Sequence, residues 1–276
     1  MAVNNMGKKI NKFKELHDCN IWFGINHLNS GLSVDGLKLT NYIKSISKRA
    51  VKKSRIFLSN YYSLFYDPVE GDSELENTIK GNEKLLGALV FPNNFLHIEN
   101  EFEKYLINKF FKKFKILRLF PKTHKYCIEA AVFNNIYSIL NKYCFPIMIT
   151  LDELDITGNK DIYWRVLFEI SNCYPDISLI IDGGNSKELV FSGYFYQLLK
   201  NTKNVFIETH NLLAFNQIEN IVDNFGSTRL IFGSYFPFYS EFLSLERIRF
   251  SRINSEDKNN ILYLNIKKII ENIKIK

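Results

Sequence analysis

The sequence predicts a single (β/α)8 TIM barrel, an α/β fold in which eight parallel strands alternate with helices. Three observations predict it. Eight short runs rich in apolar and β-branched residues recur along the chain, and each run ends in polar, proline or glycine residues. Amphipathic segments long enough for helices separate many of these runs, which is the alternation typical of a parallel sheet. The length of 276 residues fits a closed barrel, which needs about 200 to 250 residues or more.

The predicted strands and helices follow in chain order. The eight strands cover residues 19–24, 54–60, 85–92, 114–121, 145–153, 176–184, 204–210 and 228–237. Apolar residues recur at helical spacing in 101–114 and most clearly in 126–143. Segment 217–227 contains Gly226 where a helix C-terminal glycine is expected, and 255–273 begins with a serine suited to cap a helix.

The chain shows no sign of a domain boundary. No linker rich in proline, glycine or serine divides it, so we predict one domain over residues 1–276. Within this domain, residues 1–16 form a basic N-terminal lead-in and residues 255–276 a closing C-terminal helix. No apolar run reaches the roughly 18–20 residues of a membrane span, and the N-terminus lacks the apolar region of a secretory signal. We therefore expect a cytoplasmic protein with no membrane partner.

Cysteine and charge patterns limit the classes of partner. The four cysteines are widely spaced with no Cys-x-x-Cys pair, so neither a disulfide framework nor a thiolate zinc site is expected. The net charge of +7 comes largely from lysine clusters, but acidic residues are interspersed and no nucleic-acid-binding module is present. We expect no nucleic-acid partner and keep binding through the lysine-rich faces as a third hypothesis. A homo-oligomer is compatible with the sequence.

The ends of the predicted strands carry polar and aromatic residues. In a barrel of this type the functional residues lie at the carboxyl-terminal ends of the strands. The predicted binding pocket consists of Asn20, Trp22, Asn60, Tyr61, Lys122, His124, Asp152, Ser234 and Tyr235. Such a polar mouth above an apolar barrel predicts a small-molecule ligand. Arg118 and Lys122 could hold an anionic ligand, or Lys122 could simply be solvated.

Three residues at strand ends are candidates for catalysis. Glu153, Asp182 and His210 follow the fifth, sixth and seventh predicted strands. A carboxylate whose pKa is raised by burial could act as a general base, with histidine as its partner. The same carboxylates could instead cap helices, and all three groups could simply hydrogen-bond in a polar pocket. Both interpretations stay open at this point.

Several strand ends together resemble one family. Residues 228–237, TRLIFGSYFP, are similar to the last-strand pattern Arg-Ile-Leu-Phe-Gly-Ser-Asp-x-Pro of the amidohydrolase-related branch of the amidohydrolase superfamily. The stretches GNEKLLGALVFP, ILRLFPKTHKY, IIDGG, NVFIETHNL and SEDKNNILYLNIKKII resemble further elements of that branch, in the same order. The resemblance covers nearly the whole chain. It implies a TIM barrel and a metal-dependent hydrolase or a decarboxylase.

The positions that bind metal in this family differ here. Active members of the branch have Asp-x-His-x-His-x-Gly on the first strand, a histidine after the sixth strand and an aspartate after the last. The stretch 18–24, DCNIWFG, has Asn20 and Trp22 in place of the two histidines, and Asp182 and Tyr235 stand at the other two positions. The resemblance therefore implies degenerate metal-ligand motifs, and we expect no cofactor.

Two functions follow from these patterns. The first is a catalytically reduced relative that has lost the metal ligands and binds a small molecule or a partner protein through the barrel mouth. The alternative is an active hydrolase or decarboxylase of a small carboxylate or amide. It would use a metal-free acid/base site, or zinc or manganese at a relocated site of Glu153, Asp182 and His210, since carboxylates and imidazole bind such ions.

Overall fold

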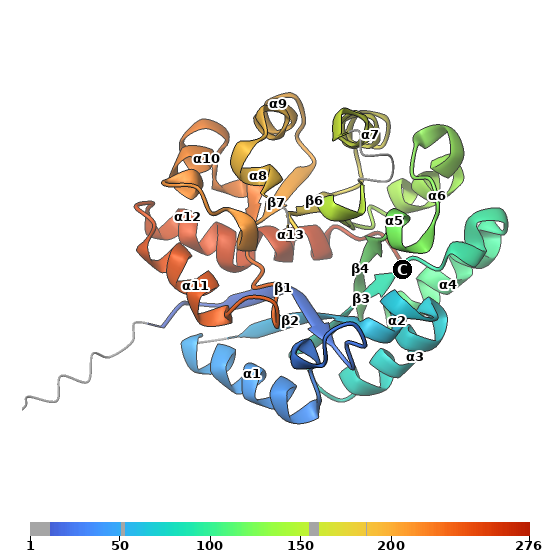
Figure 1. The fold of residues 1–276 in the computed structure, drawn as a ribbon, viewed down its shortest axis with the longest axis horizontal. Coiled ribbons are helices and arrows are strands. Elements are labelled where there is room, and N and C mark those ends of the chain that lie inside the picture. The colour runs from blue at the N-terminus through green and yellow to red at the C-terminus, as the bar shows by residue number, and fades with distance from the viewer. Residues whose placement is uncertain (1–11, 51–52, 155–159, 186) are drawn as a thin grey trace, which may run out of the picture.

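The computed structural model describes residues 12–50, 53–154, 160–185 and 187–276 (Figure 1). Eight parallel strands form one sheet in sequence order. They are β1 Leu16–Phe23, β2 Ser54–Asn60, β3 Leu85–Val90, β4 Phe114–Leu119, β5 Ile147–Thr150, β6 Leu179–Asp182, β7 Val205–Glu208 and β8 Leu230–Ile231. The predicted runs contain all of these strands except β1. This strand begins three residues before the predicted run 19–24, because residues 16–18 also pair with β2.

The first and last strands approach each other and nearly close the sheet into a barrel. The backbone N–H of Cys19 donates to Phe232 O at 3.2 Å, and that of Trp22 donates to Phe236 O at 3.0 Å. A parallel bridge joins Ile21 and Phe236 at the same edge. The predicted (β/α)8 TIM barrel is therefore confirmed.

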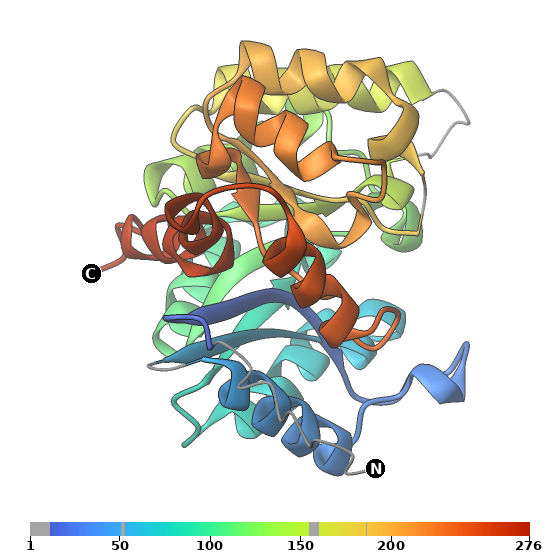
Figure 2. The ribbon, with the colours of Figure 1, turned by 90° about the vertical axis from the view of Figure 1, so that its left-hand side faces the viewer.

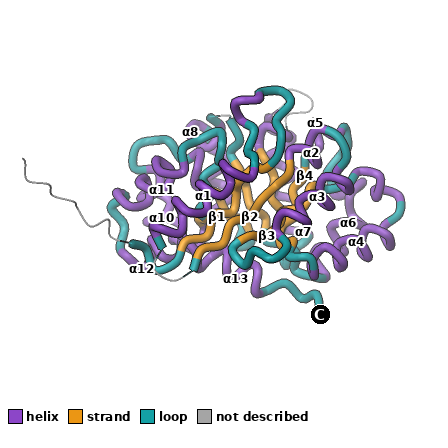
Figure 3. Tube along the Cα trace, turned by 90° about the horizontal axis from the view of Figure 1, so that it is seen from below, coloured by secondary structure: helices purple, strands orange, loops and turns teal. Residues whose placement is uncertain are grey.

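Helices surround the strands on the outside (Figure 3). They are α1 Gly36–Arg49, α2 Tyr61–Phe65, α3 Pro68–Ile79, α4 Glu99–Phe111, α5 Pro121–His124, α6 Ala130–Lys142, α7 Lys160–Cys173, α8 Glu188–Phe191, α9 Gly193–Asn201, α10 Gln217–Phe225, α11 Glu241–Phe250, α12 Ser255–Asn259 and α13 Asn265–Glu271. No helix among the described residues is long and apolar enough to cross a membrane.

The predicted C-terminal helix is divided in the structure. A π-helical turn, Asn260–Leu264, separates α12 from α13. The Asn265 side chain donates to the backbone oxygens of Ser227 and Leu230, which ties this segment to the start of β8. Figures 1 and 2 show the segment, in red, beside β1, in dark blue. Of the predicted lead-in, residues 1–11 lie outside the described residues.

The lower half of the barrel interior is apolar. Side chains on a strand alternate between its two faces, so residues two apart point the same way. The inward cluster contains Cys19, Phe57, Leu86, Ala88, Ile116, Met148, Ile180 and Ile231, with Ile266 and Ile269 of α13 packed against them. At roughly 25 cal/mol per Å2 of buried apolar surface, such a layer stabilises the barrel and leaves the strand ends to carry polar groups.

Candidate functional site

A buried polar layer lies directly above the apolar layer. Its members, each two residues beyond an inward apolar residue, are Ser59, Arg118, Thr150, Asp182 and Glu208. All of them are buried. Side chains two residues apart on a strand point to the same face, so these polar groups point into the barrel like the apolar residues before them.

Arg118 on β4 lies at the centre of this layer. Its Nη1 donates to Asn20 Oδ1 at 2.9 Å and to Ser59 Oγ at 3.3 Å. Its Nη2 donates to Thr150 Oγ1 at 3.1 Å and to Asp182 Oδ2 at 2.7 Å. The side chains of Arg118 and Asp182 are 1% and 0% exposed, so water does not screen this ion pair. One guanidinium group thus connects four other strands.

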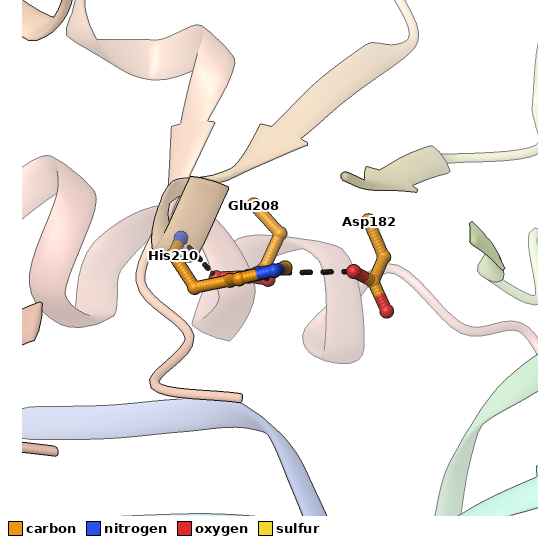
Figure 4. Close-up of side chains that lie close together, drawn as sticks. All are labelled: Asp182, Glu208 and His210. Atoms are coloured by element: carbon orange, nitrogen blue, oxygen red, sulfur yellow. Dashed lines mark hydrogen bonds and ion pairs between the residues drawn. The ribbon is translucent and has the colours of Figure 1, made fainter. Parts of the chain in front are cut away.

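A second charged pair, Glu208 and His210, lies next to Asp182 (Figure 4). His210 Nδ1 contacts Glu208 Oε2 in a short hydrogen bond and lies 3.7 Å from Asp182 Oδ1. His210 Nε2 lies 2.8 Å from Gly184 O, and the His210 backbone N–H donates to Glu208 Oε1 at 2.7 Å. Burial opposes the charged imidazole, but the two carboxylates outweigh it and raise the pKa of His210 to about 9. His210 is therefore an imidazolium at neutral pH.

Asn20 links the two charged pairs. Its Oδ1 accepts from Arg118, and its Nδ2 donates to Glu208 Oε2 at 3.0 Å. The pairing of β1 with β2 shifts register between Asp18 and Ile21, and this irregularity is where Asn20 enters the barrel. An asparagine can serve both neighbours because its amide carries an acceptor and two donors.

Aromatic rings cover the polar layer at the mouth of the barrel. Trp22 and Tyr61 stack with centroids 5.0 Å apart, and the Arg118 guanidinium carbon lies 4.7 Å from the Trp22 centroid and 5.2 Å from that of Phe120. Tyr235 stacks on the His210 ring at 4.3 Å. All four aromatic side chains are buried, and such cation–π contacts are favourable when desolvated.

Among the described residues, three buried donor groups in this mouth have no hydrogen-bond partner. They are Trp22 Nε1, Arg118 Nε and the Tyr61 hydroxyl. A buried N–H without an acceptor costs about 1–3 kcal/mol, so native proteins satisfy nearly all of them with protein, water or ligand atoms. The mouth therefore offers unused N–H groups beside flat aromatic faces.

The structure separates Glu153 from the other two predicted catalytic residues. Glu153 accepts from the N–H and the hydroxyl of Thr123, both at 2.8 Å. Glu208, not Glu153, lies beside Asp182 and His210. Glu208 is a strand-end residue in the sequence as well, two residues before His210 in the same run as Phe206, but it was not among the predicted catalytic residues.

The remaining predicted pocket residues divide into two groups. Asn20, Trp22, Tyr61 and Tyr235 belong to the mouth described above. His124 is half-buried, with Nε2 2.8 Å from Leu64 O, Lys122 is exposed, and Asp152 Oδ2 accepts from Asn185 N. Asn60 caps α2 and donates to Gly71 O at 2.8 Å, which is a structural role.

Ser234 belongs to a network at the join between β1 and β8. Its N–H donates to Asp18 Oδ1 at 3.0 Å, and the Tyr42 hydroxyl donates to Asp18 Oδ2 in a short hydrogen bond. Burial raises the pKa of Asp18 to about 6, although hydrogen bonds from Tyr42 and Ser234 act in the opposite direction. Ser234 therefore holds the barrel closed on the outer side of β1.

Asp182, Glu208 and His210 form a group that could hold a metal ion. One ligand atom from each lies within 4.8 Å of the others, and all three side chains are buried. Imidazole with two carboxylates is a donor set found with zinc and manganese. The expectation that the metal ligands are lost is therefore not confirmed. However, Asp182 Oδ2 already accepts from Arg118 and Thr150, so a cation is present beside the group.

Comparisons with known proteins bear on the fold. Neither a family model nor a curated relative matches the sequence. A solved amidohydrolase II protein matches with a TM-score of 0.69 and 12% identity, covering 93% of this chain and 99% of that one. The fold is that of the amidohydrolase-like TIM barrels.

Two decarboxylases share this barrel. The 2,6-dihydroxybenzoate decarboxylase from Rhizobium matches with a TM-score of 0.65 and 10% identity, over 94% of this chain and 99% of that one. A dihydroxybenzoic acid decarboxylase from Polaromonas, solved with manganese and the inhibitor 2-nitroresorcinol, matches with a TM-score of 0.62 and 9% identity, over 94% of this chain and 97% of that one. Likeness at this level of identity shows the fold, and activity has to be argued from the site.

Proposed function

We propose that this barrel binds a small planar molecule through acceptor oxygens at its mouth and is catalytically reduced. The observation that carries the proposal is the pair of buried, unpartnered donors Trp22 Nε1 and Arg118 Nε. They belong to one cluster, since the guanidinium carbon lies 4.7 Å from the Trp22 ring centroid. A ligand oxygen that accepts from either N–H would recover its missing hydrogen bond.

The surroundings of these donors favour a flat, electron-rich ligand. Trp22, Tyr61, Phe120 and Tyr235 provide aromatic faces, and Arg118 provides a permanent positive charge. The substrate or inhibitor named for each decarboxylase barrel above is a planar ring with several oxygens. Such compounds, 2,6-dihydroxybenzoate and 2-nitroresorcinol, are therefore suitable first probes for this chain.

The test uses the two tryptophans of the chain. In Trp164→Phe the remaining Trp22 reports ligand binding by fluorescence, and Trp164 itself lies outside the mouth, stacked on Tyr194. Calorimetry then compares Trp22→Phe, which keeps an aromatic ring but loses the N–H, with Trp164→Phe as the matched control. We expect affinity to fall about 10-fold in Trp22→Phe alone, the equivalent of about 1.4 kcal/mol. Equal affinity in the two variants, or no binding by wild type, would contradict the proposal.

A second candidate function is a metal-dependent decarboxylase or hydrolase. The observation that favours it is the group of Asp182, Glu208 and His210. These residues would hold the ion, which when bound would supply a Lewis acid at the mouth. The discriminating measurement is carbon dioxide release from 2,6-dihydroxybenzoate with and without manganese. The binding proposal expects no release under either condition, whereas release that is lost in Glu208→Gln would establish the enzyme.

A further inference from the structure

Arg118 shares a carboxylate with the group that could hold a metal ion. Asp182 Oδ2 accepts from Arg118 Nη2 at 2.7 Å and from Thr150 Oγ1 at 3.1 Å, while Asp182 Oδ1 accepts from the Gly184 N–H at 2.9 Å. Both oxygens of this carboxylate are therefore engaged by donors of the protein itself. The Arg118 side chain is 1% exposed and fixed by four hydrogen bonds, so it cannot swing into solvent without breaking the layer.

We propose that the guanidinium of Arg118 replaces a divalent ion as the cation of this barrel and keeps the neighbouring group metal-free. Removal of Arg118 would then convert Asp182, Glu208 and His210 into a metal site. This inference goes beyond the proposed function and does not depend on ligand binding at the mouth.

The count of permanent charges supports this inference. Asp182 and Glu208 contribute two negative charges, and the guanidinium, which stays protonated, neutralises one of them. A divalent ion added to this set would leave an excess positive charge in an interior without water, which is unfavourable. Without Arg118, the two carboxylates would match the charge of a divalent ion, and His210 would give up its proton to supply a neutral nitrogen ligand.

Geometry supports the same inference. The ligand atoms of the group are already close, within 4.8 Å of one another, and the Glu208 side chain is positioned by Asn20 Nδ2 at 3.0 Å. Glutamine at position 118 is neutral and can still hydrogen-bond to Asn20 or Thr150. Arg118→Gln therefore changes the charge with the least change in packing, and it is the variant of choice.

The experiment measures manganese binding by calorimetry and by electron paramagnetic resonance. Wild type should show no saturable site that depends on Glu208, and Arg118→Gln should bind one ion per chain. The matched control is Lys122→Gln, which removes an exposed positive charge at the same end of the barrel and should behave like wild type. The double variant Arg118→Gln with Glu208→Gln should lose the ion again.

The other outcomes of this experiment also decide for or against the inference. One manganese ion per chain in wild type, lost in Glu208→Gln, would show that Arg118 does not exclude metal. A folded Arg118→Gln that binds no ion would show that the group is not a masked metal site. If Arg118→Gln is unfolded in metal-free buffer, it is refolded with manganese: recovery of the native circular dichroism supports the inference, and failure to recover overturns it.

Discussion

The buried ion pair between Arg118 and Asp182 predicts a strong energetic coupling. The two groups lie 2.7 Å apart and are 1% and 0% exposed, so each would be an uncompensated charge without the other. Removing one partner of such a pair costs about 3–5 kcal/mol of folding free energy. Arg118→Met and Asp182→Asn should therefore each lower the free energy of unfolding by about that amount. Arg118→Met acts by removing four hydrogen bonds and the charge that Asp182 needs.

A double-mutant cycle tests this coupling. The double variant removes both charges, so its loss should be smaller than the sum of the single losses by at least about 2 kcal/mol. Urea unfolding at pH 7, followed by circular dichroism, measures all four free energies. Lys122→Gln serves as an exposed control and should change stability by no more than about 0.5 kcal/mol. Single losses below about 1 kcal/mol, or losses additive within about 0.5 kcal/mol, would refute the reasoning.

Two pH profiles test other buried groups. Burial raises the pKa of Asp72 to about 7 despite hydrogen bonds from Tyr105 and Ser63. The stability that this protonated carboxyl contributes is therefore fully present below about pH 4 and is lost as the pH rises from 4 through 7. Between pH 4 and 8, Asp72→Asn should gain up to about 4 kcal/mol of unfolding free energy relative to wild type, and a pH-independent difference would contradict this. Burial, reinforced by Arg55, lowers the pKa of His17 to about 3, so its stability contribution is present above pH 6.5 and lost as the pH falls toward 3. Between pH 6.5 and 3, His17→Phe should lose up to about 5 kcal/mol less free energy of unfolding than wild type does. Urea unfolding measures both proteins over this range, and an equal loss in the two would argue against the assignment.

The strands could be predicted from the sequence because each is buried on both faces. A parallel strand inside a barrel reads as a short apolar run, and seven of the eight observed strands lie within such runs. The run 228–237 is much longer than β8, which pairs over Leu230–Ile231 only. The run continues beyond Ile231 with Phe232, Tyr235 and Phe236, but these residues turn across the barrel mouth toward β1, as the hydrogen bond from Trp22 N–H to Phe236 O shows. Pairing partners, not composition, decide where a strand ends.

The site was only partly predictable for a related reason. Strand-end counting located Asp182, His210 and Trp22, because position along a strand is visible in the sequence. It did not reveal that Arg118 pairs with Asp182, since the two are 64 residues apart and are brought together only by closure of the barrel. The spacing of Ile116, Arg118 and Phe120 was nevertheless a signal. Residues two apart on a strand share a face, so an arginine between two buried apolar residues must itself point into the barrel.

The replacement of a metal ion by Arg118 is tested most directly by crystals of the wild-type protein grown with manganese chloride. An anomalous difference map recorded near the manganese absorption edge would show any ion at full contrast. We expect no peak between Asp182, Glu208 and His210, with the Arg118 guanidinium on Asp182 as in the structure above. A peak bound by those three residues, at about 2.0–2.2 Å from their ligand atoms, would contradict the account.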